Sequence, residues 1–117
     1  MGNIKIIYYT KVNGVAPVKN FLLNLDVKMR AKLTRAINLL SIAGNELRAP
    51  HSKHIQDGIF ELRAQIGTNI SRVLYFFVVG NEVILTNGFV KKTQATPLKE
   101  IEKAKRYRED YLKREGY

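Results

Sequence analysis
One glutamate and two arginines in the middle of the chain have the residue types and the spacing for chemistry on a phosphate group. Glu61 and Arg63 are two positions apart in the alternating run Ile59–Ile66. Both side chains therefore project from one face of a predicted strand, about 7 Å apart along it. Arg72 is the only charged residue in the apolar run Ile70–Val79. Because burying an unpaired charge costs several kcal/mol, Arg72 must face an open groove or a carboxylate, and Glu61 is the expected partner.

These three residues allow a structural and a catalytic interpretation. In the structural one, Glu61 forms ion pairs with Arg63 and Arg72 and the group only stabilises the sheet. In the catalytic one, the guanidinium groups bind a phosphate and stabilise the added negative charge of a phosphorane, as RNA cleavage without a metal requires. Glu61 then orients Arg72 or acts as the general base. The residues alone leave both interpretations open.

Polar residues at the end of the last predicted strand are further candidates. Lys91 and Lys92 end that strand, and because neighbouring strand residues point to opposite sides, at most one of them faces a groove directly. Thr93 and Gln94 follow them and could form hydrogen bonds with a phosphate or a base. We therefore expect this segment to contact RNA.

The two histidines of the chain, His51 and His54, lie in a predicted loop before the second strand. Histidine titrates near neutral pH, so His54 could be a general acid or base, although a loop histidine is more often simply exposed. Its neighbour Lys53 is expected at the rim of the groove, in contact with RNA. No third ligand clusters with the histidines, so we expect no metal site.

One aromatic residue and one helix face complete the expected RNA contacts. Phe76 lies an even number of residues from Arg72, so both side chains project from the same face of the predicted strand. Phe76 could stack on a base there, with core packing as its alternative role. The predicted helix Val27–Ala43 has a basic face separate from its apolar stripe, formed by Lys28, Lys32 and Arg35. Such a face is often merely solvated, but the net charge favours contact with RNA or an acidic partner.

The composition is that of a strongly basic, folded chain. The 117 residues include 20 Lys/Arg and 10 Asp/Glu, giving a net charge of +10, and 45% are hydrophobic. A polyanionic partner is therefore expected. With no cysteine, disulfides, Cys-ligated zinc, iron–sulfur clusters and a thiol nucleophile are excluded. Neither a signal-peptide pattern nor a run of membrane-spanning length is present, so we expect a cytoplasmic protein.

The elements that must position these residues follow the order β-α-α-β-β-β-α. The predicted strands are Ile4–Thr10, Ile59–Ile66, Ile70–Val79 and Val83–Lys91, and Asn45–Asp57 is predicted as a loop. Two helices, about Ala16–Leu25 and Val27–Ala43, form a hairpin over one sheet face, and a third opens with Thr96 as N-cap and Pro97 at N1. We expect one α+β domain over residues 1–117, with an antiparallel-dominated four-stranded sheet and a C-terminal helix.

Three strings of the chain resemble the RelE/ParE superfamily of type II toxin–antitoxin toxins, and in detail its phage-derived HigB-like branch. They are Pro50–Ile55 continued by Asp57–Arg63, then Ser71–Phe76, and Gly88–Pro97 before a charged helix. The resemblance implies a RelE-like fold and a cytoplasmic endonuclease that cuts mRNA, usually in the ribosomal A site. It also implies a 2′,3′-cyclic phosphate product, no metal or other cofactor, and a helix-turn-helix antitoxin similar to HigA.

The resemblance also suggests roles for single residues. Arg63 lies at a strand position similar to those where relatives keep catalytic cations, and Lys92 best matches the position of a catalytic arginine. RelE-type relatives use a tyrosine in the C-terminal segment as a base, but here that segment reads Ala95–Leu98 and its first tyrosine is Tyr107, so Glu61, His54 or no residue serves as base. Two alternatives to the mRNA endonuclease remain: a ParE-like toxin that acts on DNA gyrase, and a basic RNA-binding module without catalysis.

Overall fold

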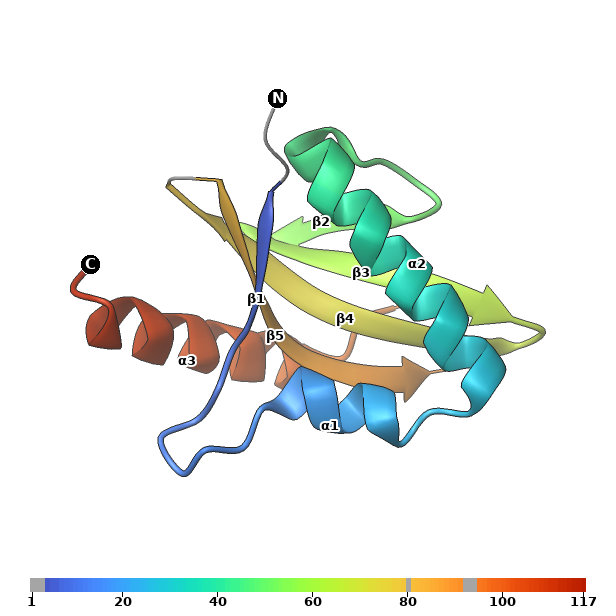
Figure 1. Ribbon diagram of the computed structural model, residues 1–117, viewed down its shortest axis with the longest axis horizontal. Helices are drawn as coiled ribbons and strands as arrows, with labels where there is room; N and C mark the ends of the chain where they lie inside the picture. The colour runs from blue at the N-terminus through green and yellow to red at the C-terminus, as the bar shows by residue number, and fades with distance from the viewer. Residues whose placement is uncertain (1–3, 80, 92–94) are drawn as a thin grey trace.

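Five strands form one sheet in the computed structural model, which describes residues 4–79, 81–91 and 95–117 (Figure 1). In spatial order the strands are β1 (Lys5–Tyr8), β5 (Glu82–Lys91), β4 (Asn69–Val78), β3 (Ile59–Ile66) and β2 (Ser52–Gln56). β1 runs parallel to β5, and the other neighbouring pairs are antiparallel. The prediction of four strands was therefore wrong by one edge strand, β2.

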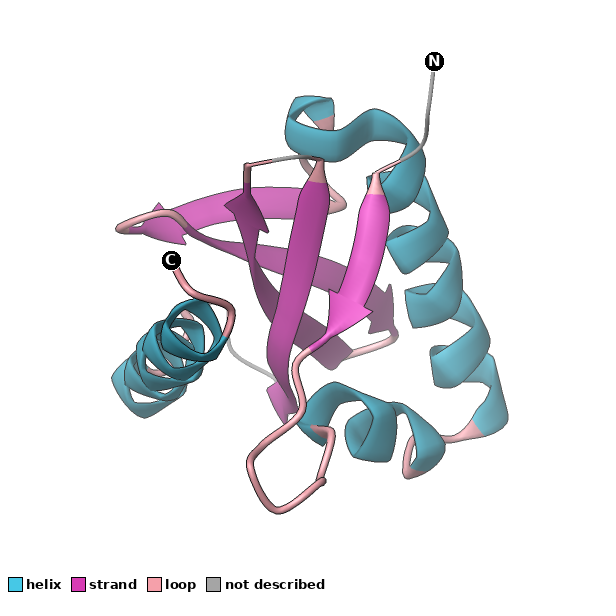
Figure 2. Cartoon of the chain, turned by 60° about the vertical axis from the view of Figure 1, so that its left-hand side comes forward, coloured by secondary structure: helices cyan, strands magenta, loops and turns pink. Residues whose placement is uncertain are grey.

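Helices pack on both faces of the sheet, with α2 and α3 on opposite sides (Figure 2). α1 (Pro17–Leu23) and α2 (Val27–Ala43), which is followed by the short 3₁₀ helix η1 (Gly44–Glu46), pack on the side of Val73 and Tyr75. α3 (Leu98–Arg114) packs on the side of Leu74 and Phe76. We call these sides the α2 face and the α3 face. The expected α+β fold with a C-terminal helix is confirmed, and of the helices described, none is long and apolar enough to cross a membrane.

β2 lies within the segment that the sequence predicts to be a loop. Its side chains are mostly polar and it is an edge strand, so hydrophobic alternation does not reveal it. The overlooked signal is the pair Asp57-Gly58, which forms a two-residue hairpin turn between Gln56 and Ile59. Asp57 and Gly58 have φ values of 51° and 79°, as such a turn requires.

The helix boundaries follow their sequence signals with one exception. α2 has the predicted bounds, and Asp26 caps it by accepting a hydrogen bond from Met29 N at 2.9 Å. α3 begins at Leu98, and its N-cap is Pro97 instead of the expected Thr96. The Thr96 hydroxyl donates to a carboxylate of the sheet instead of capping the helix.

Thr86 is an extra residue in β5 that shifts the β4–β5 pairing by one position next to Leu74. Its hydroxyl donates to the Leu74 carbonyl oxygen at 3.0 Å, which satisfies that group at the bulge. Because of this shift, Phe89 instead of Gly88 lies opposite Arg72. The bulge thus places an aromatic side chain, Phe89, opposite Arg72.

Candidate functional site
Glu61 lies between Arg63 and Arg72 on the α3 face and contacts both. Arg63 Nε is 3.0 Å from Glu61 Oε1, and Arg72 Nη1 is 3.6 Å from Glu61 Oε2. The antiparallel register produces this arrangement, because Arg63 and Arg72 are directly opposite and Glu61 is two residues before Arg63. We call Glu61, Arg63 and Arg72 the arginine cluster. The pairing of Glu61 with Arg72 that the sequence predicts is present.

Two members of the arginine cluster are buried. Glu61 and Arg72 are each 0% exposed. Arg72 Nη1 also donates to the Ala95 carbonyl oxygen at 2.9 Å, and Thr96 Oγ1 donates to Glu61 Oε2 at 2.7 Å, so the chain leading into α3 lies over both side chains. Burial lowers the pKa of the Arg72 guanidinium below its ordinary value, and the Glu61 carboxylate opposes this effect. The sequence requires either an open groove or a carboxylate for Arg72, and the structure places it against the Glu61 carboxylate.

Arg63 is the member of the arginine cluster that faces solvent, with 22% of its side chain exposed. Two guanidinium groups on opposing strand positions repel one another, and the single carboxylate between them offsets this repulsion. The three residues together carry two positive charges and one negative charge. A phosphate at the exposed side of Arg63 suits this charge and the forked geometry of the guanidinium.

Lys53 and Lys91 extend the positive charge of this face. Lys53 is opposite Glu61 in the β2–β3 pairing, and Phe89 is opposite Arg72 in the β4–β5 pairing. Lys91 follows two residues after Phe89 and so projects from the same face. Both lysines are exposed. The structure therefore brings these two predicted RNA contacts to the arginine cluster.

His54 does not belong to this group. It is opposite Phe60 in the β2–β3 pairing, and its ring packs edge-on against Phe60, with centroids 4.9 Å apart, on the α2 face. His54 Nε2 accepts a weak hydrogen bond from Gly58 N at 3.4 Å. Strand alternation sends His54 to the opposite face from Glu61, so this candidate acid or base lies away from the arginine cluster.

Phe76 lies on the α3 face as its parity predicts, but the ring is only 3% exposed. It packs beneath α3, edge-on to Tyr111 and under the Arg108 guanidinium. The ring is therefore part of the core and is not open to a base. The half-exposed aromatic beside Arg72 is Phe89, which the bulge in β5 places on this face and which the sequence pattern does not single out.

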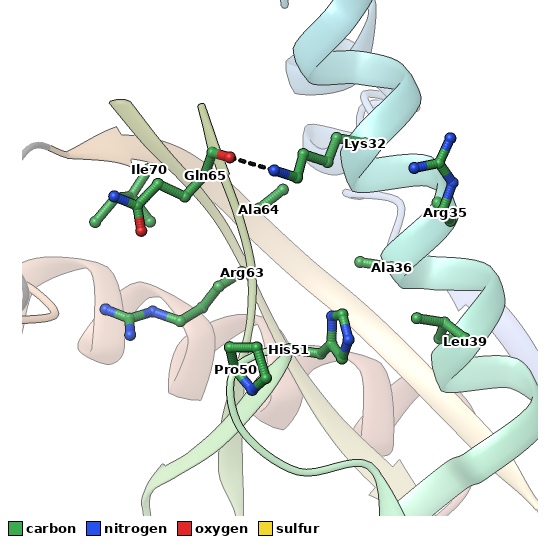
Figure 3. Close-up of a pocket in the computed structure, with 10 residues that line it drawn as sticks. All are labelled: Lys32, Arg35, Ala36, Leu39, Pro50, His51, Arg63, Ala64, Gln65 and Ile70. Atoms are coloured by element: carbon green, nitrogen blue, oxygen red, sulfur yellow. Dashed lines mark hydrogen bonds between the residues drawn. The ribbon is translucent and has the colours of Figure 1, made fainter. Parts of the chain in front are cut away.

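The basic face of α2 meets the end of β3 at a pocket of about 250 Å³. Lys28, Lys32 and Arg35 are all exposed, and Lys32 and Arg35 line the pocket. Figure 3 shows this pocket, with Lys32 Nζ donating to the Gln65 carbonyl oxygen at 2.5 Å. Arg63 also lines it, although its guanidinium points away from α2 (Figure 3). Two of the three predicted helix cations thus line the same pocket as Arg63.

Lys92, Thr93 and Gln94, which the sequence also proposes as site residues, lie outside the described residues. Within the ranges that are described, no three His, Cys, Asp or Glu residues gather in a way that could hold a metal ion.

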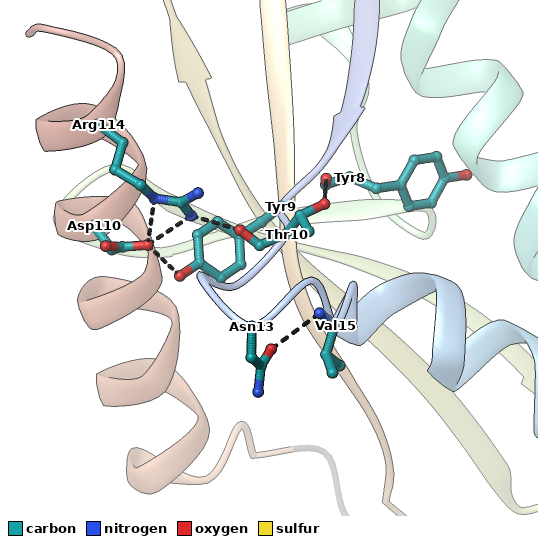
Figure 4. Close-up of polar contacts among 7 residues, drawn as sticks. All are labelled: Tyr8, Tyr9, Thr10, Asn13, Val15, Asp110 and Arg114. Atoms are coloured by element: carbon teal, nitrogen blue, oxygen red, sulfur yellow. Dashed lines mark hydrogen bonds and ion pairs between the residues drawn. The ribbon is translucent and has the colours of Figure 1, made fainter.

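A second polar group joins the other end of α3 to the sheet. Tyr9 OH donates to Asp110 Oδ2 at 2.6 Å, and Arg114 Nη2 donates to the same oxygen at 2.7 Å (Figure 4). The Arg114 guanidinium also donates to the Thr10 carbonyl oxygen and lies over the Tyr9 ring. We call Tyr9, Asp110 and Arg114 the tyrosine latch. Burial first, and then the hydrogen bond to Asp110, raise the pKa of Tyr9 from 10.0 to about 12.

A family model described as phage-derived protein Gp49-like (DUF891) matches residues 20–109, which include the whole arginine cluster, α2 and most of α3. No curated protein sequence matches the chain significantly.

Proposed function
We propose a function from the premise that this chain belongs to the Gp49-like family of phage-derived proteins, within the RelE- and HigB-like group of toxin–antitoxin toxins. The chain is a cytoplasmic toxin with a RelE-like fold that stops translation by cutting mRNA, and it does so on the ribosome. Its antitoxin is a helix-turn-helix protein similar to HigA. No cofactor takes part in the cleavage.

The observation that carries this proposal is the composition of the arginine cluster. Two arginines share one carboxylate, and Glu61 Oε1 lies 3.0 Å from Nε of the exposed member, Arg63, which restrains its guanidinium. A preorganised cation beside a surplus of positive charge is what a phosphorane needs for stabilisation. The net positive charge of the three residues favours an anionic ligand at the exposed side of Arg63.

In the proposed reaction, the RNA 2′-oxygen attacks the adjacent phosphorus, and the bond from phosphorus to the 5′-oxygen breaks. The products are a 2′,3′-cyclic phosphate and a 5′-hydroxyl. Arg63 binds the non-bridging oxygens and stabilises their growing charge, while Lys53 and Lys91 hold neighbouring phosphates. Lys92, Thr93 and Gln94 are proposed to contact the same strand of RNA.

Glu61 is proposed as a positioning residue and not as the general base. Each of its carboxylate oxygens already has a partner, since Oε1 contacts Arg63 and Oε2 contacts Thr96 and Arg72. Arg72, which is buried, holds the Glu61 carboxylate in place through their ion pair, and Glu61 in turn positions Arg63. The 2′-hydroxyl proton then leaves to water, and water returns a proton to the 5′-oxygen.

Induced expression followed by primer extension on cellular mRNA tests this proposal. Wild-type protein should produce cuts within translated reading frames, and Arg63→Ala should abolish them. Arg114→Ala is the matched control, since Arg114 is also an arginine paired with a carboxylate but belongs to the tyrosine latch. Intact mRNA together with gyrase-linked DNA breaks would overturn the proposal in favour of a ParE-like toxin. Binding of RNA with no cuts would favour a non-catalytic module.

A further inference from the structure
The pocket between α2 and β3 lies where the sheet edge is open. β2 pairs with β3 up to Ser52 and Leu62, and Arg63 N then donates to the His51 carbonyl oxygen at 2.9 Å. Beyond this point β3 continues to Ile66 without β2 beside it. The pocket opens along this free stretch (Figure 3).

The pocket has apolar walls and a basic rim. Its apolar lining comes from α2, β3 and β4, as Ala36, Leu39, Ala64 and Ile70. Lys32 and Arg35 stand at the α2 side, and the His51 ring faces Leu39 across the opening (Figure 3). An apolar slot with an aromatic ring and adjacent cations suits a flat, partly apolar group that is attached to an anion.

We propose that this pocket takes one nucleobase of the RNA, with the attached phosphate held by Lys32 and Arg35. The inference rests on the proposed function and deepens it, because it assigns the site that reads the RNA next to the cut. The volume of about 250 Å³ is below the ~300–1,000 Å³ of sites for drug-sized ligands, so it suits a single base. Single-stranded RNA is commonly read by placing unstacked bases against rings such as histidine.

Arg63 connects the pocket to the arginine cluster. Side chains from both faces of β3 line the pocket, since Ala64 projects to the α2 face while Arg63 and Gln65 project to the α3 face. The Arg63 guanidinium contacts Glu61 on the far side of the strand. RNA that crosses the open edge of β3 therefore meets Arg63 with one phosphate and the pocket with an adjacent base.

Titration of the histidine resonances by NMR tests the pocket directly, because the chain has two histidines. His51 lines the pocket, and His54 lies outside it against Phe60. Adding each of the four nucleoside 5′-monophosphates should shift the His51 ring signals saturably, with at least one base preferred, and leave His54 unmoved. Inorganic phosphate should have a much weaker effect. Equal shifts with inorganic phosphate, or equal responses of both histidines, would overturn the assignment of a base site.

Variants separate the pocket from the surrounding charge. Lys32→Ala and Arg35→Ala should each weaken nucleotide binding about tenfold, the loss expected for a charge-assisted hydrogen bond. Lys113→Ala, an exposed lysine in the last turn of α3, is the matched control and should bind as wild type. Leu39→Trp, which fills the pocket, should abolish the His51 shift. If it does not, or if Lys113→Ala weakens binding as much as Arg35→Ala, the pocket is not the site.

The titration does not depend on cleavage, so the two proposals fail separately. Cleavage that needs Arg63, combined with no response of His51, would support the endonuclease proposal and overturn the proposal of a base pocket. A saturable His51 response combined with intact cellular mRNA would support a nucleotide-binding site and overturn the endonuclease proposal. In an active toxin, Leu39→Trp should also change the base preference next to the cut, which a purely structural role of Leu39 would not do.

Discussion
The two ends of α3 are joined to the sheet by groups of the same chemical kind. At the N-terminal end, Glu61 contacts Arg72 and the Thr96 hydroxyl. At the C-terminal end, Asp110 contacts Arg114 and the Tyr9 hydroxyl. Each group thus combines a carboxylate, a guanidinium and a hydroxyl.

The groups differ in burial and in charge balance. The Glu61 and Arg72 side chains are 1% and 0% exposed, whereas those of Asp110 and Arg114 are 34% and 40% exposed. The arginine cluster has a second guanidinium, Arg63, while the tyrosine latch pairs one arginine with one carboxylate. The same types of side chain therefore form a buried, positively charged site at the N-terminal end of α3 and a solvated, neutral ion pair at its C-terminal end.

Glu61→Ala should destabilise the protein more than any other substitution in these two groups. It leaves two guanidinium groups facing each other with no carboxylate between them, and breaking a buried pair costs about 3–5 kcal/mol of unfolding free energy. Asp110→Ala should cost far less, because water replaces the lost contacts. Urea unfolding measures both, and Glu61→Gln, which keeps the shape and an acceptor, should lie between them. Equal losses for the two alanine variants would contradict the comparison.

Removing the hydroxyl group at each end of α3 should have an intermediate effect on stability. Thr96→Val deletes a hydrogen bond to a buried carboxylate, and should lower the free energy of unfolding by about 2 kcal/mol. Tyr9→Phe deletes a bond to the partly exposed Asp110 carboxylate, which water can solvate, and should lower the free energy of unfolding by less than Thr96→Val does. Thr96→Val should also slow RNA cleavage, because it loosens Glu61, whereas Tyr9→Phe should leave cleavage unchanged. The comparison fails if Tyr9→Phe is the more damaging change.

Alkaline pH should weaken the tyrosine latch in a way that identifies Tyr9. Its pKa is raised from 10.0 to about 12 in the folded protein, so the unfolded chain loses this proton first. The contribution is fully present below pH 10 and is lost as pH rises towards 12. Measured as urea unfolding from pH 9 to pH 11, the loss of stability should be shallower in Tyr9→Phe than in the wild type. An identical pH dependence in the two proteins would show that Tyr9 is not held as described.

Salt should give the smallest difference. The Asp110–Arg114 pair is solvated, so its contribution should fade between ~0.1 M and ~1 M salt, where the Debye length drops from ~10 Å to ~3 Å. The buried Glu61–Arg72 pair should be almost insensitive to salt. Double-mutant cycles on each pair at the two salt concentrations measure this, and a salt-dependent coupling of Glu61 with Arg72 would contradict its burial.

Much of this fold follows from local sequence signals. The 3.6-residue pattern and the Asp26 cap give α2 its bounds, and the alternation in β3 gives that strand. β2 was not predicted because an edge strand of polar residues has no buried face and therefore shows no hydrophobic alternation. The Asp57-Gly58 turn does mark its end. Thr96 was expected to cap α3, and its hydroxyl contacts a carboxylate 35 residues away in the sequence instead.

The candidate site shows the same division between local and non-local information. Arg72 is a lone charge in an apolar strand, so a carboxylate partner could be predicted for it. The spacing of two residues between Glu61 and Arg63 predicted that both lie on one face. The faces of His54 and Phe89 depend on the edge strand and on the bulge at Thr86, and neither can be read from periodicity. The burial of Phe76 depends on how α3 docks.

The most direct test of the central claim is the single-turnover rate at which purified protein cuts ribosome-bound mRNA. Loss of one preorganised donor typically slows a reaction by ~10²–10³, so Arg63→Ala should be slower by that factor while remaining folded. Arg114→Ala, which alters the tyrosine latch, should cut at the wild-type rate and leave the same 2′,3′-cyclic phosphate. Cutting by Arg63→Ala at the wild-type rate would contradict the account, because the arginine cluster would then be a structural ion-pair group and not the site of cleavage.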